Sequence, residues 1–268
     1  MDREKWMPEY IEKLEDETIS FFDVTKYIQQ YMPDKLYSYK KINAYWKDAV
    51  FKGCVHMSYA SDFNDPFDCL PTIDFSKDSG AIATAYREYS KSMEPRCRKA
   101  KKDIDNVVKD LLENIQKNAL IACFTETYKS MLMWSYYAEN HKGICIEYDT
   151  KKDDVFKSIT LPVIYEEKRY NALRQLATQN RNIIMNSHLY KAACWKHENE
   201  WRILCSADNG VYSENNIFMK HAISGVYLGA KINVDIEKEI CEWGKKENIP
   251  IYKMELDNTT YELKRRKL

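Results

Sequence analysis

Glycine and proline are scarce in this sequence. Seven of each occur in 268 residues, whereas an average glycine usage of about 7% would give about 19 glycines. This scarcity argues against collagen-like repeats, glycine-rich linkers and glycine-rich phosphate loops. No apolar stretch approaches the ~18 residues that a membrane span needs, and the first residues are charged. We therefore expect a cytoplasmic protein with no membrane partner.

Neither sign of charge is in excess. Lys plus Arg and Asp plus Glu both number 41, so no global basic field draws the chain toward nucleic acid or anionic lipid. The eight cysteines include no Cys-x-x-Cys pair and no tight Cys/His cluster, which are the usual signs of a zinc site. We therefore expect free, mostly buried thiols, with no cysteine zinc site and no disulfide framework.

The composition is typical of a globular protein of one or two domains, with 44% hydrophobic and 31% charged residues. Three-to-four spacing of apolar residues predicts helix over residues 8–33. We interpret residues 1–35 as an N-terminal helical extension and 36–268 as the main domain, with a helical insertion at about 79–119. The extension's apolar stripe is expected either to fold back on the domain or to dock on a partner protein.

Strands and helices are mixed along the main domain without regular alternation, which predicts an α+β fold rather than a doubly wound sheet. A helix capped by Ser130 is expected before Gly143, and the basic end 264–267 is expected to be solvated. Other helices are predicted at 171–191 and 235–247. Strands are predicted at 35–40, 50–60, 120–124, 143–148, 161–166, 195–205, 223–230 and 249–255.

The segment from Trp195 to Leu204 carries the most informative polar pattern. In a strand, period-two geometry places Glu198, Glu200 and Arg202 on one face. One interpretation is a half-solvated strand with a cross-strand charge ladder. The other is a pair of carboxylates at a cleft, of which one polarises a substrate hydroxyl and the other handles a second substrate.

Two more segments carry polar groups beside aromatic residues. Residues 63–68 read as a turn whose flanking Phe63 and Phe67 anchor it to a core. In residues 133–143, Trp134 and Tyr137 are either core or ligand contacts, and His141 is either a helix-end partner or a ligand contact. We predict that these segments meet the Glu-x-Glu strand in one cleft. The predicted cleft residues are Asn64, Asp65, His141, Glu198, Glu200 and Arg202.

In the order of these motifs, the sequence resembles the bacterial domain of unknown function 2971. The resemblance runs from about residue 36 to the end, and Ser38 departs from it where an Arg is expected in a Tyr-Arg-Tyr strand. It is carried by the segments 36–39, 63–68, 123–126, 133–143, 195–202 and 228–229.

A looser resemblance is to the ADP-ribosyltransferases, through Tyr37-Ser38-Tyr39, Ser58 and Glu198-x-Glu200. It implies a split, twisted mixed sheet around NAD. Glu200 would bond the ribose 2′-hydroxyl and Glu198 would act in transfer to an acceptor. The acceptor stays open among protein, nucleic acid and small molecule, and the biological role implied is the toxin or effector of a bacterial defence system. The implied NAD contacts are Tyr37, Tyr39, Ser58, Asn64, Asp65, Trp134, Tyr137, His141 and Arg202.

Two other functions stay open at this point. One is a metal-dependent hydrolase or nuclease, in which Asp65, Asp68, His141 and Glu200 would supply hard ligands. The other is a non-enzymatic sensing or interaction domain of a defence system, with the N-terminal helices docking a partner.

Overall fold

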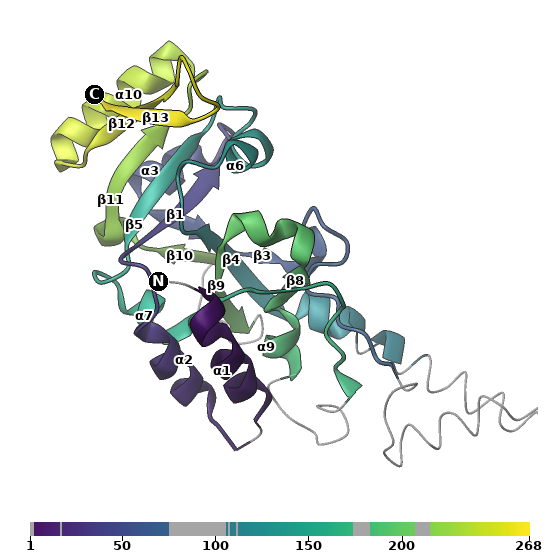
Figure 1. Cartoon of the computed structure of the whole chain (residues 1–268). Coiled ribbons are helices and arrows are strands. Elements are labelled where there is room, and N and C mark those ends of the chain that lie inside the picture. Colours follow the sequence, from purple (N-terminus) through teal and green to yellow (C-terminus); the bar gives the residue numbers. More distant parts are fainter. Residues whose placement is uncertain are drawn as a thin grey trace, which may run out of the picture.

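The computed structural model describes residues 3–16, 18–74, 106, 108–110, 112–173, 183–206 and 215–268. It shows helices together with a mixed sheet of many strands, which confirms the α+β class (Figure 1). The helices are α1 (Arg3–Glu15), α2 (Phe21–Gln29), α3 (Trp46–Phe51), α6 (Met131–Tyr136), α7 (Asp154–Ile159), α9 (Ile183–Ser187) and α10 (Val234–Glu247), with 3₁₀ turns η1 (Ala60–Asp62), η2 (Ala193–Glu198) and η5 (Lys220–Ala222). The strands are β1 (Lys35–Lys40), β2 (Cys54–His56), β3 (Ser58–Tyr59), β4 (Ala119–Thr125), β5 (Ile144–Asp149), β6 (Thr160–Pro162), β7 (Ile164–Glu166), β8 (Tyr190–Ala192), β9 (Glu200–Ser206), β10 (Asn216–Phe218), β11 (Ile223–Leu228), β12 (Ile251–Leu256) and β13 (Leu263–Lys267).

The main sheet has the strand order β13-β12-β11-β5-β1-β4-β9-β6, with β3 added beside β4. Only β11 and β12 pair in parallel among these neighbours, and α10 connects them. Strand β1 pairs with β5 along its whole length, from Lys35 to Lys40. Its register with β4 is a single pair, Tyr37 opposite Thr125. The sheet therefore splits between β1 and β4, and Figure 1 shows its two halves running in different directions.

The N-terminal helices are part of the main core. The one helix predicted over residues 8–33 is two helices, α1 and α2. Ser20 caps the start of α2 by accepting a hydrogen bond from the Asp23 amide at 3.2 Å. Trp6 of α1 stacks on Tyr31 with ring centroids 5.1 Å apart. The apolar stripe is thus folded back, because its members share one buried cluster with the strands of the sheet. Those members are Trp6, Tyr10, Leu14, Val24 and Ile28.

Several predicted elements are confirmed and others are wrong. The strand at 35–40 has the predicted bounds, and the strand predicted at 120–124 is β4. The strand predicted at 195–205 starts only at Glu200, because the preceding residues form η2 and Asn199 has a φ of 44°. The strand predicted at 50–60 begins as helix α3. The end at 264–267 is solvated as predicted, since its side chains are exposed, and its backbone pairs with β12 as edge strand β13.

The predicted insertion at about 79–119 lies mostly outside the described residues, as does much of the helix predicted at 171–191. In the described ranges, no helix combines the length and the apolar character that crossing a bilayer would require.

If the N-terminal helices are integral to the core, truncating a buried side chain of α2 will destabilise the whole protein. Ile28→Ala removes a side chain with 0% exposure and should lower the free energy of unfolding by about 2–5 kcal/mol. Phe22→Ala on the same helix is the control, since Phe22 is 71% exposed and should change stability by less than about 0.5 kcal/mol. Denaturant unfolding measures both, and equal effects would contradict a shared core.

Candidate functional site

A cleft opens where β1 and β4 diverge. It has a volume of about 200 Å³ and is lined by side chains from both edges of the split, including Tyr37 and Tyr39 of β1 and Cys123 of β4. Its floor holds charged residues that come from three other segments. These are Asp68, Lys191, Glu198 and Glu200.

Two local features position the charged residues of the cleft, namely the backbone conformation of Asn199 and the pairing of β7 with β8. Asn199 adopts the left-handed conformation that Asn tolerates better than most residues, and so ends η2 immediately before β9 begins at Glu200. Strand β8 pairs in parallel with β7, which places Lys191 opposite Tyr165. The Tyr165 hydroxyl in turn accepts a hydrogen bond from the Glu200 amide at 2.8 Å, so the small β7–β8 sheet is joined to β9.

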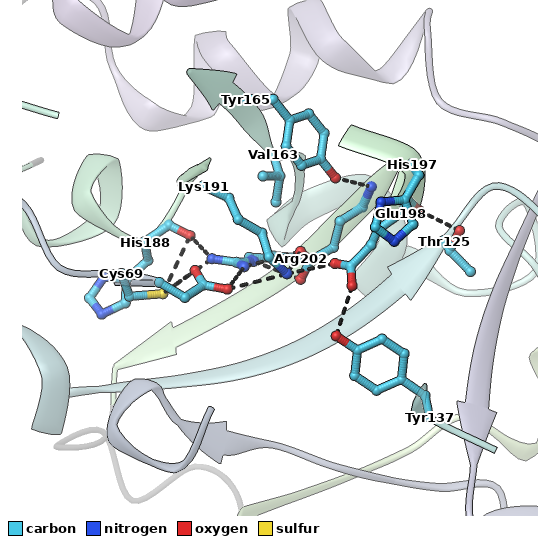
Figure 2. A network of polar contacts seen from close by, with 12 residues as sticks. Cys69, Thr125, Tyr137, Val163, Tyr165, His188, Lys191, His197, Glu198 and Arg202 are labelled. Atoms are coloured by element: carbon cyan, nitrogen blue, oxygen red, sulfur yellow. Dashed lines mark hydrogen bonds and ion pairs between the residues drawn. The ribbon is translucent and has the colours of Figure 1, made fainter. Parts of the chain in front are cut away.

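Lys191 is the central cation of this site (Figure 2). Its ammonium group lies 2.6 Å from Glu198 Oε2, 3.0 Å from Glu200 Oε2 and 3.3 Å from Asp68 Oδ2. The four side chains are at most 5% exposed. Because charges so far from water are costly without partners, this geometry couples the positions of all four residues.

Arg202 forms the second cationic centre and is completely buried. Its Nε donates to Glu200 Oε1 at 2.8 Å, and its Nη2 donates to Asp68 Oδ2 at 2.8 Å. Its Nη1 donates to the carbonyl oxygen of His188 at 2.6 Å. The guanidinium therefore ties β9 to the 63–68 turn and to the segment before β8.

The network has one negative charge more than it can neutralise. Three carboxylates, of Asp68, Glu198 and Glu200, face two cations, Lys191 and Arg202, so the formal sum is −1. Burial alone would raise the pKa of Glu200, but Arg202 and Lys191 outweigh it and hold that pKa well below its usual range. Burial alone would lower the pKa of Lys191, but Glu200 and Asp68 raise it.

Glu198 and Glu200 differ in the donors that they already bind. Glu200 accepts from Arg202 with both carboxylate oxygens and also from Lys191. Glu198 accepts one hydrogen bond at each oxygen, from the Tyr137 hydroxyl at 2.7 Å and from Lys191. A carboxylate has about four lone-pair sites, so Glu198 keeps more of its capacity for a ligand in the cleft.

Most of the predicted site residues line this one cleft. They are Tyr37, Tyr39, Ser58, Asn64, Tyr137, Glu198 and Glu200. Arg202 lies against Glu200 without lining the cleft, so it can position a carboxylate but cannot contact a ligand there. Phe63 anchors the 63–68 turn by packing under the Arg202 guanidinium, 5.5 Å from its ring centroid. The anchoring predicted for Phe67 is wrong, since that ring is 60% exposed.

Three residues predicted to contact a ligand lie away from the cleft. Trp134 has no exposed surface, and its indole nitrogen donates to the carbonyl oxygen of Tyr128 at 2.7 Å, so it cannot stack on a ligand. His141 stacks on Trp134, and burial together with Lys231 lowers its pKa. Asp65 stabilises the turn by accepting from the Phe67 amide at 2.9 Å.

Lys191 and Cys123 line the cleft without having been predicted from the sequence. A signal for Lys191 existed, because a buried face carrying Glu198, Glu200 and Arg202 needs a further cation to approach neutrality. The residue lay at the end of a predicted helix, which gave no indication of its position relative to β9. Cys123 is the exposed position in the burial pattern of β4, so its thiol is accessible in the cleft.

The ligand set of the metal-hydrolase interpretation does not come together. Asp68 and Glu200 are held by Lys191 and Arg202, and neither Asp65 nor His141 lines their cleft. Within the ranges that the structure describes, no group of three or more His, Cys, Asp or Glu side chains is arranged to hold a metal ion.

Residues 133–203 match the model of a family described as "Protein of unknown function (DUF2971)". Over this stretch, which is less than half of the chain, the sequence is similar to the DUF2971 family. The matched segment includes Tyr137, Lys191, Glu198, Glu200 and Arg202, which is the whole charged network except Asp68. No curated protein and no solved structure matches the chain.

The two carboxylates should respond differently to amide substitution. At position 198 a glutamine can accept from Lys191 and donate to the Tyr137 hydroxyl, so Glu198→Gln should change the free energy of unfolding by less than about 1 kcal/mol. At position 200 a glutamine amide would face the Arg202 donors, so Glu200→Gln should cost about 3–5 kcal/mol. Urea unfolding of both variants measures this, and equal losses would contradict the assigned roles.

Stability should also depend on pH through Glu200. Its pKa is lowered from the ordinary 4.5 in the folded protein, so its contribution is complete above that value and is lost as the pH falls below it. The stability difference between wild type and Glu200→Gln should therefore narrow between about pH 5.5 and pH 3, by at most about 1.4 kcal/mol per pH unit. Urea unfolding across this range tests it, and a constant difference would show that Glu200 is not held ionised.

Proposed function

We propose that the protein is an NAD-consuming enzyme of the ADP-ribosyltransferase type. The observation that carries the proposal is that three segments distant in sequence line the same cleft. These are Tyr37–Tyr39 of β1, Ser58 of β3, and the Glu198-x-Glu200 pair. They are the segments on which the resemblance to ADP-ribosyltransferases rests, and the cleft lies in the split of the main sheet.

The charge of the cleft supports this choice of substrate. The nicotinamide ring of NAD is a cation, and the floor of the cleft carries a formal charge of −1. When the bond between the ribose C1′ and nicotinamide breaks, its electron pair leaves with the ring nitrogen and positive charge develops on the ribose. A fixed carboxylate in a site with little water stabilises such a charge.

We assign the direct ribose contact to Glu198 and a positioning role to Glu200. Glu198 keeps free acceptor sites toward the cleft, whereas Glu200 is committed to Arg202 and Lys191. This exchanges the roles expected from the sequence. Burial and the Glu198 carboxylate raise the pKa of Tyr137, which keeps its hydroxyl protonated as a donor.

In the transfer step, a nucleophilic atom of the acceptor forms a bond to C1′ as nicotinamide departs, and the acceptor's proton passes to solvent. Water in place of the acceptor gives hydrolysis. Modification of a cellular target by this reaction would suit a toxin or effector of a bacterial defence system, which is the role that the sequence resemblance implies.

Release of labelled nicotinamide from NAD tests the proposal. Wild type should release label in the presence of cell extract, and Glu198→Gln should reduce the rate by about 10²–10³-fold, the usual effect of losing one such electrostatic contact. Glu255→Gln is the control, because Glu255 is an exposed carboxylate that pairs with Arg266 on β13, and it should keep the wild-type rate.

Equal rates for wild type and Glu198→Gln would contradict the assigned role of Glu198. Absence of release by wild type across varied extracts would favour the non-enzymatic sensing interpretation. A chelator should leave the wild-type rate unchanged, since the cleft's carboxylates are held by Lys191 and Arg202.

A further inference from the structure

A second cavity, of about 520 Å³, adjoins the cleft. Lys40, His56 and Ser58 line both spaces, so the two are continuous at the end of β1. Together their volumes lie within the range of about 300–1,000 Å³ that is typical of small-molecule sites. A ligand longer than the acidic cleft could therefore extend past Lys40 into the second cavity.

Lys40 stands at this junction without a counterion. Its side chain is half-buried, and no acidic group in the described ranges forms an ion pair with it. The nearby Lys52 and Lys47 differ, because they pair with Asp48 at 2.8 Å and with Glu239 at 2.5 Å. Burial lowers the pKa of Lys40, which is the expected response of an ammonium group that loses water without gaining a partner.

The backbone holds Lys40 in place. Lys40 is the last residue of β1 and pairs with Ile144 of β5. Its carbonyl oxygen packs so closely on Gly143 that a Cβ atom at position 143 would overlap it. An unpaired cation is thus fixed at the junction by the main sheet rather than by a loop.

The remaining lining of the second cavity suits an anionic aromatic ligand. Lys41 adds a second positive charge, and among the lining residues that the structure describes the one carboxylate, that of Asp48, is already neutralised by Lys52. Tyr45 is 74% exposed at the same cavity, which leaves its ring face free for stacking. The two connected spaces are therefore polarised, with a net negative floor in the cleft and lysines in the second cavity.

We propose that the second cavity is a phosphate-binding subsite, in which Lys40 and Lys41 hold the diphosphate of a nucleotide and Tyr45 stacks on its base. One part of this proposal rests on the proposed function, namely that the ligand bound in the second cavity also places a cationic group in the acidic cleft. A ligand with a cationic ring at one end and a diphosphate beyond it matches the polarity of the two spaces. Binding of a nucleoside diphosphate to the second cavity can be measured without any catalytic turnover, so it tests the subsite separately from the proposed enzymatic activity.

Calorimetric titration of the full chain with ADP and with adenosine tests the subsite. Wild type should bind ADP at least about tenfold more tightly than adenosine, and Lys40→Met should weaken ADP binding by at least about tenfold, since one charge-assisted hydrogen bond is lost. Adenosine binding should stay unchanged. Lys117→Met is the matched control and should bind ADP as wild type does, because Lys117 is exposed, pairs with Glu113 and does not line either space.

The thermal midpoint of Lys40→Met should equal or exceed that of wild type, because an unpaired, half-buried charge is removed; this separates lost binding from misfolding. Unchanged ADP affinity in Lys40→Met, or equal affinity of wild type for ADP and adenosine, would overturn the subsite. Lys40-dependent ADP binding without nicotinamide release would support the subsite while refuting the proposed function. Nicotinamide release together with ADP binding that does not depend on Lys40 would support the proposed function while refuting the subsite.

Discussion

Arg202 has no exposed surface and donates to Glu200, to Asp68 and to the carbonyl oxygen of His188. These partners come from β9, from the turn after β3, and from the chain that leads into β8. A buried guanidinium tolerates few alternative arrangements, because each lost partner leaves a charge that water cannot reach. This requirement also places the acidic residues of the cleft. Arg202 fixes Glu200, and Lys191 contacts both Glu200 and Glu198.

The parts of the fold that depend on local pattern could be predicted from the sequence. The short strand predicted over Lys35–Lys40 is β1 with the same bounds, and Ser130 caps α6 by accepting from the Met133 amide as expected. The strand predicted from Trp195 failed because alternation alone cannot distinguish a strand from a 3₁₀ turn that leads into one. Only the left-handed backbone at Asn199 separates the two, and Asn adopts that conformation without requiring it.

The sequence was sufficient to predict which segments form the site, but not which individual side chains contact one another. Glu198, Glu200 and Tyr137 line the cleft together with residues from β1, as their polar and aromatic character indicated. Trp134 and His141 lie away from the cleft, because sequence spacing cannot show which way α6 and the turn after it face. Lys191 escaped prediction because its partners are set by the β7–β8 pairing, which is tertiary.

The join between β1 and β4 has a mechanical consequence. Strand β4 is fixed to β9 along seven register pairs, and β1 to β5 along six, whereas β1 and β4 share one. Each half of the sheet is therefore stiff, but the angle between the halves is resisted by little backbone hydrogen bonding. A molecule lying across the split would contact both halves at once and act as a brace, so that its dissociation and the flexing of the sheet become a single event.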